Sequence, residues 1–90
     1  MNYQVIKSLR LKQYEDGVVI YDTASGETLQ LDIITGFLLD KLILSPSNSS
    51  DLIHYLEEVS AHEISLSESE ILPYINALVA NNLVAKCDLP

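Results

Sequence analysis

The pattern of apolar and polar residues changes its period near Asp32, which predicts strands before that residue and helices after it. Apolar and polar residues alternate in two early runs, and a β-branched and aromatic run lies between them. The three predicted strands are 5–14, 18–21 and 28–31. Beyond Asp32, apolar residues recur at helical spacing, which predicts helices near 33–44, 50–61 and 67–81.

Two turn signals join the strands into consecutive hairpins. Glu15-Asp16-Gly17 is typical of a tight turn, and 22–27 is typical of a longer loop. In that loop Asp22 can accept hydrogen bonds from nearby N–H groups, and Gly26 can adopt a positive φ. Because the third strand leads directly into a helix, we expect Thr28–Leu31 to lie at an edge of the sheet.

Capping residues mark the start of each helix. Asp32 or Thr35 is expected to cap the first helix, and Ser49 or Ser50 the second, after a Ser-rich loop. The third helix begins with a capping box at 67–70, in which Ser and Glu side chains bond to each other's backbone N–H groups.

Three further features refine the helices. Leu52, Leu56 and Val59 recur at i, i+4 and i+7, which predicts one buried stripe on the second helix. Pro73 lacks an N–H, so we expect a kink or a late start in the third helix. That helix is expected to end at Asn81-Asn82, residues that tolerate a left-handed conformation.

Strands followed by helices indicate an α+β fold. We expect one domain over 1–90, with a three-stranded antiparallel sheet followed by three helices. An extended tail at 83–86 would serve as a wing, so the arrangement is that of a small winged helix-turn-helix domain.

Charge and composition limit the classes of partner. The net charge is −8, and the predicted second and third helices carry no Lys or Arg, so nucleic acid binding is disfavoured. Lys7, Arg10 and Lys12 form one basic cluster, interpreted as a solvated strand face that opposes edge pairing. No apolar run approaches the length of a membrane span, and the lone Cys87 favours a cytoplasmic location.

No group of residues predicts catalysis, a metal site or a cofactor. Cys87 has no adjacent His, and His54 and His62 lack further ligands. Glu57-Glu58 is interpreted as a solvated helix face, and no glycine-rich phosphate loop is present. We therefore expect a protein that is not an enzyme.

The hairpin region carries a family resemblance. The segment DGVVIYDTASGET at 16–28, followed by Leu29, Leu31, Asp32 and an apolar helix, resembles the PqqD-like peptide chaperones, also called precursor-peptide recognition elements. It is most similar to the subgroup that accompanies HPr-kinase-like proteins. The similarity extends over nearly the whole chain.

This resemblance implies binding of the leader segment of a ribosomally synthesised precursor peptide, which is presented to a modifying enzyme or HPr-kinase-like protein. The leader would add as a strand beside the third predicted strand and pack against the third helix. The implied peptide-binding residues are Thr28, Leu29, Gln30, Leu31, Leu72, Ile75 and Val79.

Two other functions stay open. A winged-helix DNA-binding regulator would need a basic recognition helix. A structural subunit would use the edge strand to pair with another protein or with a second copy in a homodimer. The apolar residues of the third helix could also all belong to the core of so small a domain.

Overall fold

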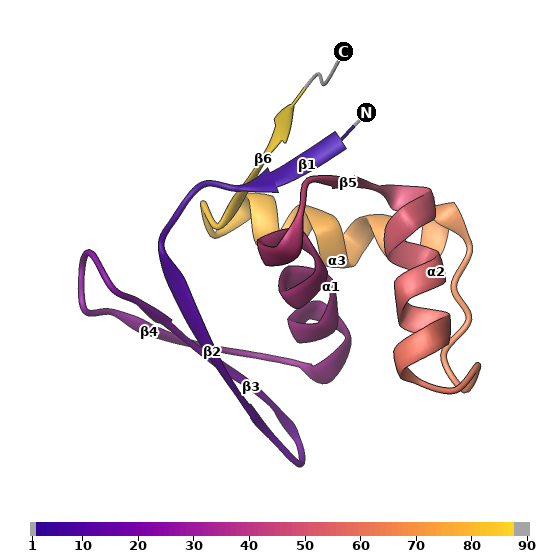
Figure 1. Ribbon diagram of the computed structural model, residues 1–90, viewed down its shortest axis with the longest axis horizontal. Coiled ribbons are helices and arrows are strands. Elements are labelled where there is room, and N and C mark those ends of the chain that lie inside the picture. The colour runs from indigo at the N-terminus through magenta and orange to yellow at the C-terminus, as the bar shows by residue number, and fades with distance from the viewer. Residues whose placement is uncertain (1, 88–90) are drawn as a thin grey trace.

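The computed structural model describes residues 2–87, which form two small antiparallel sheets and three α-helices (Figure 1). The strands are β1 (Asn2–Val5), β2 (Leu9–Tyr14), β3 (Gly17–Asp22), β4 (Thr28–Leu31), β5 (Ser47–Asn48) and β6 (Val84–Cys87). The helices are α1 (Ile33–Leu44), α2 (Ser49–Val59) and α3 (Glu68–Ala80).

The larger sheet has the order β2-β3-β4 and is built from consecutive hairpins. Tyr14 pairs with Gly17 across a two-residue turn, and Val18 pairs with Leu31. The period-two pattern buries Val18 and Ile20 of the central strand against the helices. The predicted three-stranded sheet, with Thr28–Leu31 at its edge, is therefore confirmed. The succession of this sheet and three helices confirms the α+β fold class.

The smaller sheet has the order β5-β1-β6 and joins distant parts of the chain. β1 lies in its centre, and Val5 pairs with Val84 of β6. The expected extended tail is thus a strand, and Val84 is buried in the core. Figure 1 shows β1 and β6 side by side above the helices.

The prediction of a single strand over 5–14 is wrong, because that segment belongs to both sheets. The Ile6 N–H donates to the Leu83 carbonyl (3.0 Å) in the small sheet. The Ser8 carbonyl instead accepts from the Thr23 N–H (2.9 Å) in the large one. Backbone groups only two residues apart therefore bond to different sheets, and the strand is interrupted between β1 and β2.

Two of the predicted helix caps are confirmed and one is wrong. Asp32 caps α1, and its carboxylate accepts from the Thr35 N–H (2.7 Å). The capping box at 67–70 is present at the start of α3. α2 is capped by Asn48 and not by a serine, because β5 holds Asn48 extended and its side chain accepts from the Asp51 N–H (2.8 Å).

The structure corrects two details of the helices. Leu52 and Leu56 are buried as predicted, but Val59 is 41% exposed because α2 ends at that residue. α3 begins directly after its cap and includes Pro73, so the expected late start is wrong. At the end of α3, Asn82 has a φ of 59°, which confirms the left-handed turn there.

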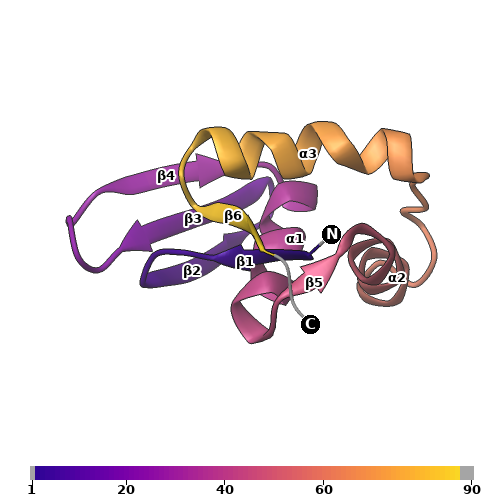
Figure 2. The ribbon, with the colours of Figure 1, turned by 90° about the horizontal axis from the view of Figure 1, so that it is seen from above.

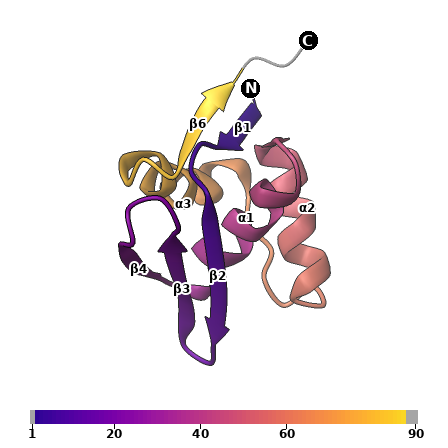
Figure 3. The same ribbon diagram turned by 60° about the vertical axis from the view of Figure 1, so that its left-hand side comes forward.

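The core lies between the large sheet and the helices. Figure 2 shows α3 beside β4, and α1 next to the large sheet with its C-terminal end on the side of β2. Figure 3 shows the same order from another side. The fully buried apolar residues of the helices are Leu38, Leu39, Leu52, Leu56, Ile71, Ile75 and Leu78.

Gly36 permits the close contact between α1 and β3. A Cβ atom at this position would overlap the Val18 side chain and lie 2.7 Å from the Val18 Cβ atom. We expect Gly36→Ala to lower the free energy of unfolding by about 1–3 kcal/mol, because it overpacks the core. Urea denaturation measures the loss.

The matched control is the same substitution in a Val18→Ala background, where the clashing side chain is shortened. The double variant should lose less stability than the sum of the two single variants. Additive losses would show that the contact with Val18 does not cause the strain.

Candidate functional site

β4 has an open edge, because among residues 2–87 it pairs with β3 alone. The Asp22 N–H donates to the Glu27 carbonyl (2.9 Å) at the start of the hairpin. Bonded and non-bonded pairs alternate along an antiparallel ladder. The backbone groups of Leu29 and Leu31 therefore point toward β3, and those of Thr28 and Gln30 point toward the open edge.

The loop before β4 is held by its own hydrogen bonds, which fix the position of the edge. The Asp22 carboxylate accepts from the Ala24 N–H (2.9 Å) and the Ser25 N–H (3.4 Å). These bonds, led by the one from Ala24, lower the pKa of Asp22 below its ordinary value. Gly26 has a φ of 78°, as the sequence predicts, and its N–H donates to the Asp22 carbonyl (2.8 Å).

The two faces of β4 differ in chemistry. Leu29 and Leu31 lie on the inner face, are half-buried and pack against the core. Thr28 and Gln30 are exposed on the outer face. An added strand would thus have an apolar side toward the helices and a polar side toward solvent.

The three predicted residues of α3 have different surroundings. Ile75 is 0% exposed in the core, so its side chain does not line an open surface. Leu72 is 42% exposed, and Val79 is half-buried against the core. Of the residues expected to form a wall for the peptide, only Leu72 and Val79 are therefore accessible.

A hollow of about 160 Å³ joins β4 to the C-terminal end of α3. Its lining residues are Lys7, Leu9, Ile20, Asp22, Glu27, Thr28, Leu29, Asn81 and Leu83. The hollow brings the first two residues of β4 together with the turn that follows α3. Asn81 and Leu83 were not predicted to be parts of this surface, although the Asn-Asn pair marked the turn.

Two carboxylates, Asp22 and Glu27, line the hollow beside this edge together with one cation, Lys7. Neither β4 nor α3 contains Lys or Arg, whereas α3 begins with Glu68 and Glu70. The Ser67 N–H donates to the Glu70 carboxylate (3.0 Å) and lowers the pKa of Glu70, so its charge is retained at neutral pH. Lys7, which lines the hollow, lies 3.8 Å from the Asp22 carboxylate.

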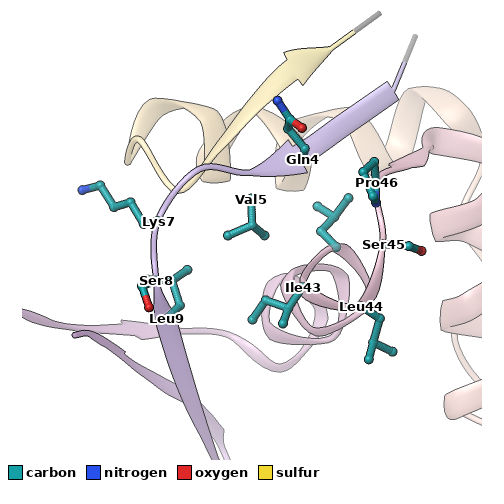
Figure 4. Close-up of a pocket in the computed structure, with 10 residues that line it drawn as sticks. Gln4, Val5, Lys7, Ser8, Leu9, Ile43, Leu44, Ser45 and Pro46 are labelled. Atoms are coloured by element: carbon teal, nitrogen blue, oxygen red, sulfur yellow. The ribbon is translucent and has the colours of Figure 1, made fainter. Parts of the chain in front are cut away.

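A larger hollow lies elsewhere, between β2 and the C-terminal end of α1 (Figure 4). Its volume is about 420 Å³, and its lining residues are Gln4, Val5, Lys7, Ser8, Leu9, Leu42, Ile43, Leu44, Ser45 and Pro46. This hollow was not predicted from the sequence. The available signal was the nearly all-apolar segment Ile33–Leu44, which has more apolar residues than one buried face requires.

Ionisable side chains do not form a metal site in the part of the chain that is described. His54 and His62 are exposed, and Cys87 is a half-buried free thiol. Burial and a hydrogen bond to Asp40 (2.8 Å) raise the pKa of Tyr55 to about 12, so its hydroxyl stays protonated. No helix within 2–87 has both the length and the apolar character needed to cross a bilayer.

Comparison with known proteins gives one informative match. No protein-family profile matches the chain, and no curated protein is similar to it in sequence. Among solved structures, the chain is similar to TbiB1, whose structure was determined in complex with the TbiA(β) leader peptide. The TM-score is 0.63 at 16% sequence identity, over 94% of this chain and 99% of TbiB1. The resemblance predicted from the hairpin region is therefore confirmed at the level of the fold.

Proposed function

We propose that this protein binds the leader segment of a ribosomally synthesised precursor peptide by adding it as a strand to β4. The main support is the open edge, where the backbone groups of Thr28 and Gln30 point away from the sheet. Strand addition uses such groups for affinity and alternate side-chain contacts for specificity. Further support is the fold shared with TbiB1, a protein solved with a leader peptide bound.

The side chains around the edge suit a peptide of defined character. Apolar residues of the peptide would contact Leu29 and Leu31 from the sheet and Leu72 and Val79 from α3. Basic residues would complement the carboxylates beside the edge, since no cation lies on β4 or α3. Such complementarity increases the rate of association and the selectivity for the correct peptide.

The bound leader would be presented to a modifying enzyme or to an HPr-kinase-like protein. Strand addition leaves the rest of a precursor free, so a second protein could act on it while the leader stays bound. DNA binding receives less support, because α2 and α3 carry acidic residues and no Lys or Arg.

A titration with the leader peptide of a precursor encoded beside this gene tests the proposal. Amide chemical shifts should change at 28–31 and along α3, and the affinity should fall as salt is raised, because exposed charges become screened. Changes confined to β2 or α2 would contradict the proposal. Self-association through β4, detected by sedimentation, would assign the edge to a homodimer instead.

A further inference from the structure

The large sheet has a second open edge, because β2 also pairs with β3 alone within the described residues. In a central strand, successive residues point their backbone groups to alternate neighbours. Val18 and Ile20 point toward β4, so Val19 and Tyr21 point toward Lys12 and Arg10 of β2. The backbone groups of Leu9, Leu11 and Gln13 therefore point outward, away from β3.

Two hollows lie along this edge, between β2 and α1. The upper one has a volume of about 420 Å³, and Figure 4 shows Leu9 across from Ile43 there. The lower one, of about 130 Å³, lies between Leu11 and Gln13 of β2 and Phe37 of α1. We call the two hollows together the β2–α1 groove.

The rim of the β2–α1 groove exposes large apolar side chains. Leu44 is 73% exposed, Ile6 is 50% exposed and Ile43 is 41% exposed. Ile43 and Leu44 line the upper hollow, and Ile6 lies in sequence between two other residues that line it. Neighbouring apolar side chains left in water are typical of a surface that is covered by a partner.

Most of the protein's cations surround the same groove. Arg10 and Lys12 are exposed on the outer face of β2, and Lys7 lines the upper hollow. Lys41 of α1 donates a hydrogen bond to Ser45, another lining residue (3.2 Å). The chain has five Lys and Arg in total, so the rest of this acidic protein carries one.

Carboxylates lie near both ends of the groove. At the upper end, the Asp22 carboxylate lies 3.8 Å from the Lys7 ammonium nitrogen, and Lys41 shares a hollow with Asp51 and Glu58. Asp40 lines the lower hollow and accepts a hydrogen bond from Tyr55 (2.8 Å). Glu15 and Asp16 form the turn after β2. Arg10 and Lys12 are therefore the cations that give the open edge of β2 its positive charge.

We propose that the β2–α1 groove binds an acidic, extended segment of a partner polypeptide, which adds to β2 as a strand. Alternate residues of that segment would lie beside Arg10 and Lys12 on the outer face, so they should be Asp or Glu. The residues between them would point into the groove, against Leu9, Ile43 and Leu44, so they should be apolar. Opposite charges and apolar pairs across strands both stabilise such pairing.

A second copy of this chain fits the groove less well than an acidic segment. Antiparallel pairing of two β2 strands with Leu9 opposite Leu11 would place Arg10 opposite Arg10 of the other copy. Like charges directly opposite each other in a ladder are destabilising. The same cations that attract an acidic segment therefore oppose self-association through β2.

The test uses two capped synthetic peptides of about eight residues, a usual strand length. One alternates Val with Glu, and its control alternates Val with Lys. We expect the Glu peptide to shift the amides of 9–14 and 37–44, and the Lys peptide to leave them unchanged. Equal binding of both peptides, or shifts confined to 28–31, would overturn the proposal.

Variants separate this groove from the edge of β4. Arg10→Glu combined with Lys12→Glu should weaken binding of the Glu peptide by about tenfold, because two favourable pairs become repulsive. Gln13→Pro removes one outward donor and should also weaken it. Gln30→Pro, on the β4 edge, should leave the affinity for the Glu peptide unchanged. Binding of the Glu peptide at β2 can therefore be tested whether or not a leader peptide binds at β4.

Leu44→Asp tests the apolar contact at a highly exposed position, where the substitution should not disturb the fold. It should weaken binding of the Glu peptide, since it places a carboxylate beside the apolar residues of the probe. Amide spectra of each variant report whether the fold is retained. Two outcomes would refute the assignment. One is a correctly folded double variant, Arg10→Glu with Lys12→Glu, that binds the Glu peptide as tightly as the parent protein. The other is dimerisation of that variant through β2.

Discussion

Ile75→Asp is expected to unfold the protein and not merely to weaken peptide binding. The Ile75 side chain is fully buried in the core. A carboxylate there would be buried without a partner and would replace apolar contacts, a change that commonly costs more than about 4 kcal/mol. Native proteins are stable by only about 5–15 kcal/mol, so much of the folded population should be lost. Circular dichroism with urea denaturation measures the effect.

Leu72→Asp is the matched substitution on the same helix, at an exposed position. It should leave the free energy of unfolding within about 0.5 kcal/mol of the parent protein, as surface changes usually do. If α3 forms one wall of the leader site, this variant should bind the leader peptide more weakly. Unchanged binding by a folded Leu72→Asp variant would remove Leu72 from the proposed site.

Gln30→Pro is expected to abolish strand addition while the sheet stays folded. The Gln30 N–H points to the open edge, so the proline ring removes a donor that the sheet itself does not use. An added strand would lose a central ladder hydrogen bond and would clash with the proline ring. We expect leader affinity to fall by at least about tenfold, a factor that corresponds to about 1.4 kcal/mol. Isothermal titration calorimetry measures the change.

Leu29→Pro distinguishes loss of the donor from loss of the hairpin. The Leu29 N–H points toward β3, so proline there removes a bond within the sheet and deletes a half-buried side chain. This variant should unfold the β3–β4 hairpin, which amide spectra would reveal. If Gln30→Pro disrupted the hairpin as Leu29→Pro does, the assigned direction of the backbone groups would be incorrect.

Local signals explain why much of the fold is predictable from the sequence. The change of period near Asp32 locates the end of the sheet, and the Asp22–Gly26 loop fixes the hairpin that leaves β4 at an edge. Capping depends on neighbouring residues, so Asp32 and Ser67 could be identified directly. Asn48 was missed because its extended conformation depends on pairing with β1.

Features that depend on distant partners could not be predicted in the same way. The break after Val5 arises because β1 pairs with β6, at the other end of the described chain. The burial of Ile75 depends on which face of α3 packs against the core. Because α3 is apolar on much of its surface, the helical spacing of its apolar residues does not identify that face. The β2–α1 groove depends on the angle between a strand and a helix that are far apart in sequence.

The pairing of β1 with β6 also has a consequence for the order of folding. The two hairpins of the large sheet close short loops, whereas the register Val5 to Val84 closes almost the whole chain. Closing a long loop costs more conformational entropy, so contacts of this kind form slowly. The small sheet should therefore assemble last, on a nucleus of hairpins and α1. Its amides should exchange with solvent through partial openings that leave both edges of the large sheet intact.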